Sequence, residues 1–122
     1  MSIEFNENIP IYIQIMNHIK RDIVTGKLKG GDKLSSVREM AEAMKVNPNT
    51  IQRAYQELER ENVTYTQRGM GTFITEDSSK VMELKREMSK ELIFYFIKGM
   101  KDLGFNNEEI INVISQYVSK ED

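Results

Sequence analysis

Residues 46–58 read VNPNTIQRAYQEL and contain the start signals and the buried face of one helix. Asn47 is a residue type that caps helix N-termini, and Pro48 suits the first helical position, where its missing N–H would be unpaired anyway. Apolar side chains then follow the i, i+3, i+4, i+7 spacing of one helix face, at Ile51, Ala54, Tyr55 and Leu58. The pattern predicts a helix from Pro48 to about Asn62.

Two further helices are expected upstream. Ser36 and Glu39 have the spacing of a capping box, which predicts a short helix over residues 37–44. An earlier helix should begin after Pro10 and end near Gly26, with an apolar stripe formed by Tyr12, Ile15, Met16, Ile19 and Ile23. The two short helices before and after the turn at residues 45–47 have the outline of a helix-turn-helix.

The sequence period changes after this predicted helix-turn-helix. Residues 63–66 and 72–75 are rich in β-forming side chains, and Gly69 and Gly71 lie between them. Glycine permits the positive φ that a tight hairpin turn needs. A helix-turn-helix followed by a hairpin predicts a mostly helical winged helix.

The outer face of the helix over residues 48–62 is polar at its N-terminal end. It carries Asn49, Gln52, Arg53 and Gln56, with Thr50 in the first turn. Arginine can pair with guanine, and asparagine or glutamine with adenine, so these side-chain types can read base edges in the major groove. Any surface helix also has a polar outer face, so this pattern alone leaves a purely structural explanation open.

Charge is distributed unevenly. The whole chain has a formal charge of −2, but residues 27–53 carry a net charge of +3. The six basic residues in this stretch are Lys27, Lys29, Lys33, Arg38, Lys45 and Arg53. Arg68, beside Gly69 at the hairpin tip, adds another positive charge, which either enters a minor groove or only marks an exposed turn. A basic patch at the helix-turn-helix is typical of phosphate binding.

Composition limits the function classes. The 122 residues are 39% hydrophobic and 30% charged, as in a soluble globular protein, and no apolar run reaches the ~20 residues of a membrane span. With no cysteine and one histidine, His18, the chain has little material for a metal site or a catalytic triad. The acidic, polar start is unlike a signal peptide. We expect a cytoplasmic, non-enzymatic protein without metal or cofactor.

Six motifs between about Ile9 and Ile74 carry a resemblance that covers this stretch nearly without gaps. They are PIY at 10–12, GDKL at 31–34, SVREMA at 36–41, VNPNTI at 46–51, RAY at 53–55 and RGMGTFI at 68–74. Together they resemble the winged-helix head of GntR-family transcription regulators, and NPNT with RAY resembles the YtrA-type subfamily. The family usually has proline where Ser35 stands and glycine near Asn62.

The resemblance implies a DNA-binding residue set. Its members are Ser36, Arg38, Asn47, Asn49, Thr50, Gln52, Arg53, Arg68 and Gly69. Arg38 would contact a base or a phosphate, and Arg68 and Gly69 would be the wing contacts. Arg53 could instead pair with Glu57 one turn further on.

A polar stretch at residues 76–79 divides a predicted DNA-binding domain, 1–77, from a helical region, 78–122. The second region should contain a long helix over 80–103, partly apolar on all sides, and a last helix capped by Asn106 and Glu109. We expect these helices to pack against a second copy in a homodimer. The predicted interface residues are Leu84, Met88, Leu92, Phe96, Met100, Ile110, Ile114 and Tyr117.

The leading hypothesis is a repressor that binds a palindromic double-stranded DNA operator. By resemblance it would control its own operon, often one encoding an ABC transporter. The alternatives are a winged-helix module that binds protein without reading DNA sequence, a monomer whose tail folds back on its head, and a small enzyme. The sequence identifies neither a small-molecule effector nor the operator.

Overall fold

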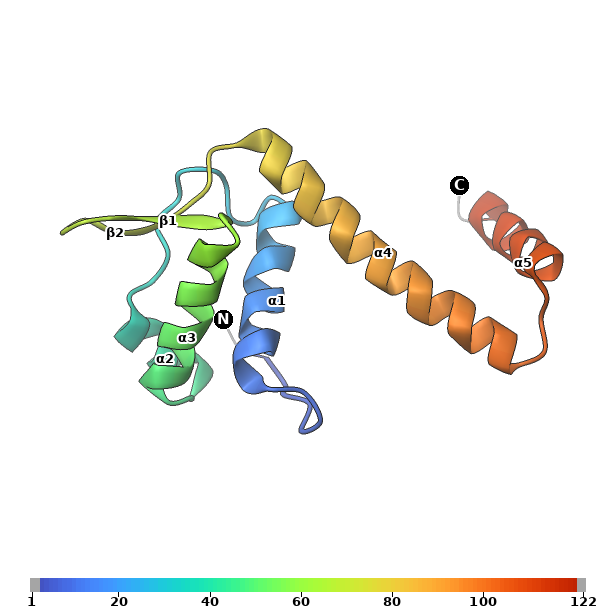
Figure 1. Ribbon diagram of the computed structural model, residues 1–122, viewed down its shortest axis with the longest axis horizontal. Helices are drawn as coiled ribbons and strands as arrows, with labels where there is room; N and C mark the ends of the chain where they lie inside the picture. Colours follow the sequence, from blue (N-terminus) through green and yellow to red (C-terminus); the bar gives the residue numbers. More distant parts are fainter. Residues whose placement is uncertain (1–2, 121–122) are drawn as a thin grey trace. The chain divides into compact units, whose positions relative to one another are not determined.

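The computed structural model describes residues 3–120, which form five helices and one two-stranded antiparallel hairpin (Figure 1). The chain divides into two compact units, one ending at Lys85 and the other beginning at Arg86. We call them the head (3–85) and the tail (86–120). Asp77, the last residue of the domain expected from the sequence, is followed directly by the helix α4 (Ser78–Asp102), whose first turns belong to the head.

The core of the head lies between α1 (Ile11–Val24) and α3 (Pro48–Arg60). The two helices pack side by side, and Ile15, Ile19 and Leu58 have no exposed surface. Lys20 Nζ on α1 also lies 2.8 Å from Glu61 Oε1, just beyond the end of α3. The predicted helices and their apolar stripes are therefore confirmed, although Tyr12 is only half-buried.

Side-chain caps define where the two helices of the helix-turn-helix begin. The Glu39 N–H donates to Ser36 Oγ and the Ser36 N–H donates to Glu39 Oε1, both at 3.1 Å, so the predicted capping box starts α2 (Val37–Met44). Asn47 Oδ1 accepts from the Asn49 N–H at 2.8 Å and starts α3. Between the two helices Lys45 has φ 57°, the left-handed conformation that ends α2 and turns the chain.

One long-range hydrogen bond holds the lead-in to α2. The hydroxyl of Tyr55 on α3 donates to the Ser35 carbonyl at 2.8 Å. Burial raises the pKa of Tyr55 strongly, and the nearby Glu39 carboxylate raises it further, so this hydroxyl stays protonated and able to donate. The family that the sequence resembles usually has proline at residue 35, where this chain has serine. The hydrogen bond from Tyr55 holds the backbone carbonyl of this serine in place.

The hairpin consists of β1 (Thr64–Gln67) and β2 (Gly71–Ile74), paired so that Thr64 faces Ile74. Each strand is shifted by one residue from its predicted position, because Val63 and Thr75 lie just outside the ladder and are joined by a separate hydrogen bond. Gly71 has φ +125°, and a Cβ there would lie 2.7 Å from Lys33 Cε. The backbone conformation therefore favours glycine at residue 71, whereas the flexible end of the Lys33 side chain could move aside.

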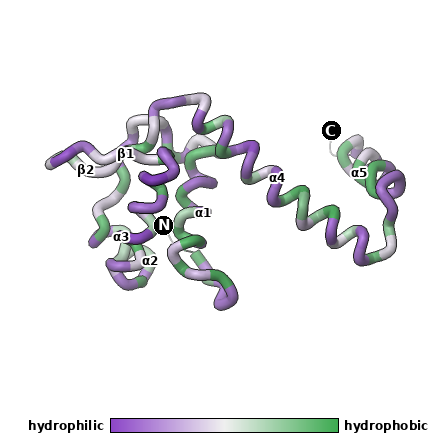
Figure 2. The backbone as a smooth tube through the Cα atoms, viewed as in Figure 1, coloured by the Kyte–Doolittle hydropathy of each residue, from purple (hydrophilic) through white to green (hydrophobic). Residues whose placement is uncertain are grey.

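The tail contains the rest of α4 and the helix α5 (Asn107–Lys120). Asn106 and Glu109 exchange the two hydrogen bonds of a capping box at 2.9 Å, as predicted, and Gly104 has φ +94° between the helices. Hydrophobic residues recur along the second half of α4 and along α5 (Figure 2). Many of them are exposed, unlike the apolar stripes of the head.

Candidate nucleic-acid interface

The N-terminal half of α3 presents a polar surface whose position is fixed by the buried side of the same helix. Asn49, Gln52 and Arg53 are exposed, and Thr50 is half-buried. The opposite face is buried through Ile51, Ala54, Tyr55 and Leu58. The helix cannot rotate about its axis without exposing this apolar stripe, so the polar residues are held toward solvent.

The start of α2 adds two of the predicted residues. Ser36 Oγ accepts a hydrogen bond from the Glu39 N–H within the capping box. Hydrogen bonds from Ser36, chiefly from its backbone N–H, lower the pKa of Glu39 below the usual 4.5. Arg38 is exposed and forms no ion pair within residues 3–120. Its guanidinium is therefore available to an external anion.

Arg53 has a partner that the sequence did not indicate. Its guanidinium carbon lies 3.9 Å from the centre of the Tyr12 ring on α1. Glu57, the alternative partner considered from the sequence, pairs instead with Arg60. Tyr12 lies at the edge of the apolar stripe of α1, and helical spacing alone does not distinguish a buried ring from one at that edge.

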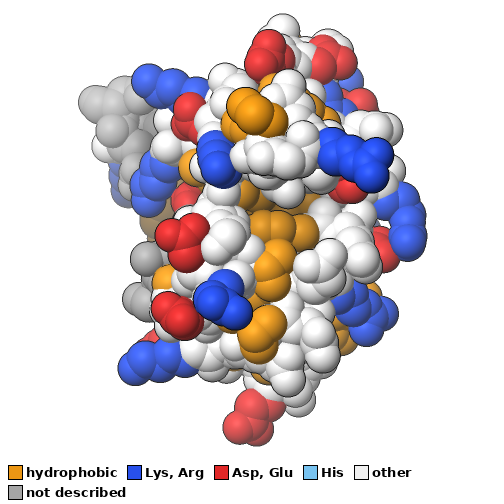
Figure 3. Space-filling view, turned by 90° about the vertical axis from the view of Figure 1, so that its left-hand side faces the viewer, with side chains coloured by type: hydrophobic (Ala, Val, Ile, Leu, Met, Phe, Trp, Pro, Cys, Tyr) orange, Lys and Arg blue, Asp and Glu red, His pale blue; other side chains and the backbone are white. Residues whose placement is uncertain are grey.

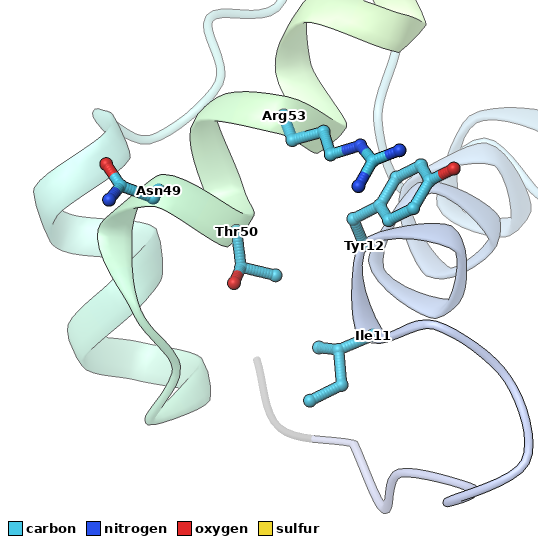
Figure 4. A pocket seen from close by; sticks show the side chains of 5 residues that line it. All are labelled: Ile11, Tyr12, Asn49, Thr50 and Arg53. Carbon is cyan, nitrogen blue, oxygen red and sulfur yellow. The ribbon is translucent and has the colours of Figure 1, made fainter.

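A shallow hollow of about 380 Å³ lies beside this pair (Figure 4). It is lined by Ile11, Tyr12, Asn49, Thr50 and Arg53. The hollow therefore joins the first turns of α1 and α3, and three of its residues belong to the set predicted for DNA binding.

Arg68 and Gly69 occupy the hairpin turn, and both are exposed. Gly69 has φ +76°, and the turn closes through a hydrogen bond from the Met70 N–H to the Gln67 carbonyl. A Cβ at Gly69 would meet no atom within 4 Å, so this backbone is open to close approach. Arg68, like Arg38, pairs with no acidic residue in the described part of the chain.

The charges around α3 differ between its two ends. At the C-terminal end Glu57 pairs with Arg60 and Glu61 pairs with Lys20, so two of the three acidic side chains there, all but that of Glu59, have a basic partner. Seen from the side of the hairpin, Lys and Arg side chains surround much of the visible margin, with Asp and Glu among them (Figure 3). The basic groups of the helix-turn-helix and the hairpin remain free to meet an anionic surface.

The predicted dimer residues fall into three groups by their burial. Leu84 and Ile110 are buried within a single chain, and Met88 and Met100 are half-buried. The other four are exposed: Leu92, Phe96, Ile114 and Tyr117. These four side chains, and part of the two methionines, remain in contact with water in a single chain.

Within residues 3–120, no cluster of three His, Cys, Asp or Glu side chains could hold a metal ion. None of the described helices is long and apolar enough to cross a membrane.

Comparison with known proteins places these features in a family. Residues 11–74, more than half of the chain, match the bacterial regulatory proteins of the gntR family. The chain is 47% identical over 117 residues to the HTH-type transcriptional regulator YhcF of Bacillus subtilis, covering 96% of this chain and 97% of that protein. It is 45% identical over 111 residues to the HTH-type transcriptional repressor YtrA of the same organism, covering 90% and 85%.

A solved GntR-family transcriptional regulator from Listeria monocytogenes has the same fold. The two chains superpose with a TM-score of 0.84 at 46% identity, covering 92% of this chain and 98% of the Listeria chain. The chain described here belongs to the gntR family of bacterial regulatory proteins, and it is a transcriptional regulator with a winged-helix DNA-binding domain.

Proposed function

We propose that the protein is a cytoplasmic repressor that binds a palindromic operator as a homodimer. The observation that carries this proposal is the exposed polar start of α3, held in place by a fully buried opposite face. Recognition helices read bases in the major groove mainly through such N-terminal residues. Arg38 and Arg68, which have no ion-pair partner among the described residues, would bind the flanking DNA.

The tail supports the homodimer. Leu92 and Tyr117 are 72% and 68% exposed, and the neighbouring helices leave an apolar groove of about 630 Å³. The groove is lined by Phe96, Met100, Leu103, Phe105, Val113, Ile114, Tyr117 and Val118. Monomeric proteins rarely expose large contiguous apolar patches, and a second copy would cover these side chains symmetrically. Two heads joined in this way would match a two-fold symmetric operator.

Our proposal about the regulated genes rests only on the resemblance to YtrA-type regulators. YtrA-type regulators often control the operon in which they are encoded, and that operon often encodes an ABC transporter. We propose the same arrangement for this protein.

The proposal is tested by selecting bound duplexes from a random DNA library at physiological salt. The expected result is an enriched palindrome whose half-sites are about one helical turn apart. The absence of any enriched sequence, with binding that disappears as salt rises, would contradict the proposal and favour a protein-binding module.

A substitution in α2 tests whether the helix-turn-helix binds the selected DNA site. Arg38→Ala should abolish operator binding while the oligomeric state and melting temperature stay unchanged. Arg60→Ala is the matched control, because it removes the same charge from the far end of α3. If Arg38→Ala also unfolds the head, or if it binds the operator normally, the assigned contact is wrong.

A further inference from the structure

The contact between Tyr12 and Arg53 joins the start of α1 to the DNA-facing side of α3. The distance of 3.9 Å from the guanidinium carbon to the ring centre is well inside the ~6 Å range of a cation–π interaction. Arg53 remains exposed and has no carboxylate partner within residues 3–120. The tyrosine ring restricts the guanidinium without neutralising its charge, so an anion can still bind it.

The side chain of Arg53 points in a different direction from that of Asn49 on the same helix (Figure 4). In the close view, its guanidinium extends toward α1 and the Tyr12 ring, whereas the Asn49 amide points to the other side of the helix (Figure 4). Between them lies the hollow that Thr50 and Ile11 help to line. Arg53 is therefore aimed away from the Asn49 amide, one of the side chains that would read base edges (Figure 4).

We propose that Tyr12 is a positioning residue that holds Arg53 to bind a backbone phosphate of the operator. This proposal rests on DNA binding through α3, as proposed above. A helix in the major groove has a phosphate strand on either side, and a side chain that leans off the helix toward α1 meets the strand rather than the bases. The planar guanidinium can donate two parallel hydrogen bonds to a phosphate. Arg53 then contributes affinity and register but no sequence preference.

The assignment of a phosphate contact is tested by the salt dependence of binding. The full chain and Arg53→Ala are titrated with the selected operator and with a scrambled duplex between 50 and 200 mM salt. One lost phosphate contact should reduce the slope of log K against log salt by about 0.9, so the affinity deficit shrinks roughly 3.5-fold across this range. The deficit should be equal for both duplexes. Arg60→Ala, at the far end of the same helix, should leave the slope unchanged.

The role of Tyr12 is tested by removing and restoring the ring. Tyr12→Leu should weaken binding roughly 2- to 5-fold, as expected for the loss of an exposed cation–π contact. Tyr12→Phe should rescue this loss, because it keeps the ring and removes only the hydroxyl. In the Arg53→Ala background, Tyr12→Leu should have no further effect. Melting temperatures separate these effects from loss of the fold.

Three results would overturn the proposal. Arg53→Ala could relax the preference at one base pair with an unchanged salt slope, which would make Arg53 a base-reading residue. Tyr12→Leu could bind as the parent does, or its loss could add fully to that of Arg53→Ala. Either result would mean that the ring does not position the arginine. If the parent protein prefers no duplex, the proposed operator function fails, but the salt slope on the scrambled duplex still tests the phosphate contact.

Discussion

The head and the tail of this protein differ in how they remove apolar side chains from water. In the head, the stripes of α1 and α3 cover each other, and Ile19, Ile51 and Leu58 have no exposed surface. In the tail, the apolar side chains of α4 and α5 exceed what the two helices can cover, and Phe94 and Tyr117 remain more than 60% exposed. The tail helices are as regular as those of the head, so regular helix formation alone does not bury an apolar face. The apolar stripes of the head are covered within one chain, whereas the tail leaves apolar side chains exposed, and we propose that a second copy covers them.

The largest expected effect comes from breaking the core of the head. Leu58→Ala should lower the free energy of unfolding by about 2–5 kcal/mol, because it leaves a cavity between α1 and α3. Urea denaturation followed by circular dichroism measures this loss. Leu92→Ala in the tail is the matched control and should cost far less at low protein concentration, since Leu92 is exposed in one chain. Equal costs at the two positions would contradict the distinction between head and tail.

The next effect concerns the tail. Phe96→Asp should weaken the dimer about 100-fold or more, because Phe96 lines the apolar groove and a carboxylate there would be buried without a partner. Sedimentation velocity should then find monomers, and operator affinity should fall sharply.

Ser115→Asp adds the same charge to α5 at a position outside the residues that line the groove, and it should leave the dimer intact. An intact dimer of the Phe96→Asp variant would place the interface elsewhere.

A smaller effect is expected within the helix-turn-helix. Tyr55→Phe removes the hydrogen bond to the Ser35 carbonyl and should cost about 0.5–1.5 kcal/mol of unfolding free energy. Tyr65→Phe is the control, because the Tyr65 hydroxyl donates to Glu76 at an exposed site. If both variants unfold at the same denaturant concentration as the parent, the Tyr55 contact does not stabilise the lead-in to α2.

The smallest effect is a pH dependence. The pKa of Glu39 is lower in the folded state than its usual 4.5, so its capping interaction stabilises the fold above pH 4.5 and is lost as the pH falls through the lowered value. Glu39→Gln can keep the capping geometry without titrating. The stability difference between the parent and this variant should therefore shrink below pH 4.5. A difference that grows on acidification would contradict the assigned cause.

Much of the head could be predicted from the sequence because its signals are local. Ser36 with Glu39, and Asn47 with Pro48, mark helix starts within a few residues, and the helical spacing identifies the buried faces. The predicted position of each hairpin strand differs by one residue from the observed one. Pairing with the opposite strand, rather than composition, decides where a ladder ends.

The contacts that shape the candidate site could not be predicted in this way. Tyr12 with Arg53, and Tyr55 with Ser35, join residues far apart in the chain, and nothing in the spacing specifies their pairing. In the tail, the sequence could not show which apolar residues are buried within one chain. The sequence indicated helices that are apolar on several sides, but Leu84 and Ile110 prove to be buried within one chain, so only part of the predicted stripe needs a partner.

Sedimentation velocity of the full chain, from about 1 to 50 µM, tests most directly whether the tail is completed by a second copy. We predict a species of about twice the 14.2 kDa of one chain, which persists when one palindromic operator is added and binds it as a single dimer. A species of 14.2 kDa across the whole concentration range would contradict the account, because the exposed side chains of α4 and α5 would then remain in water without a partner.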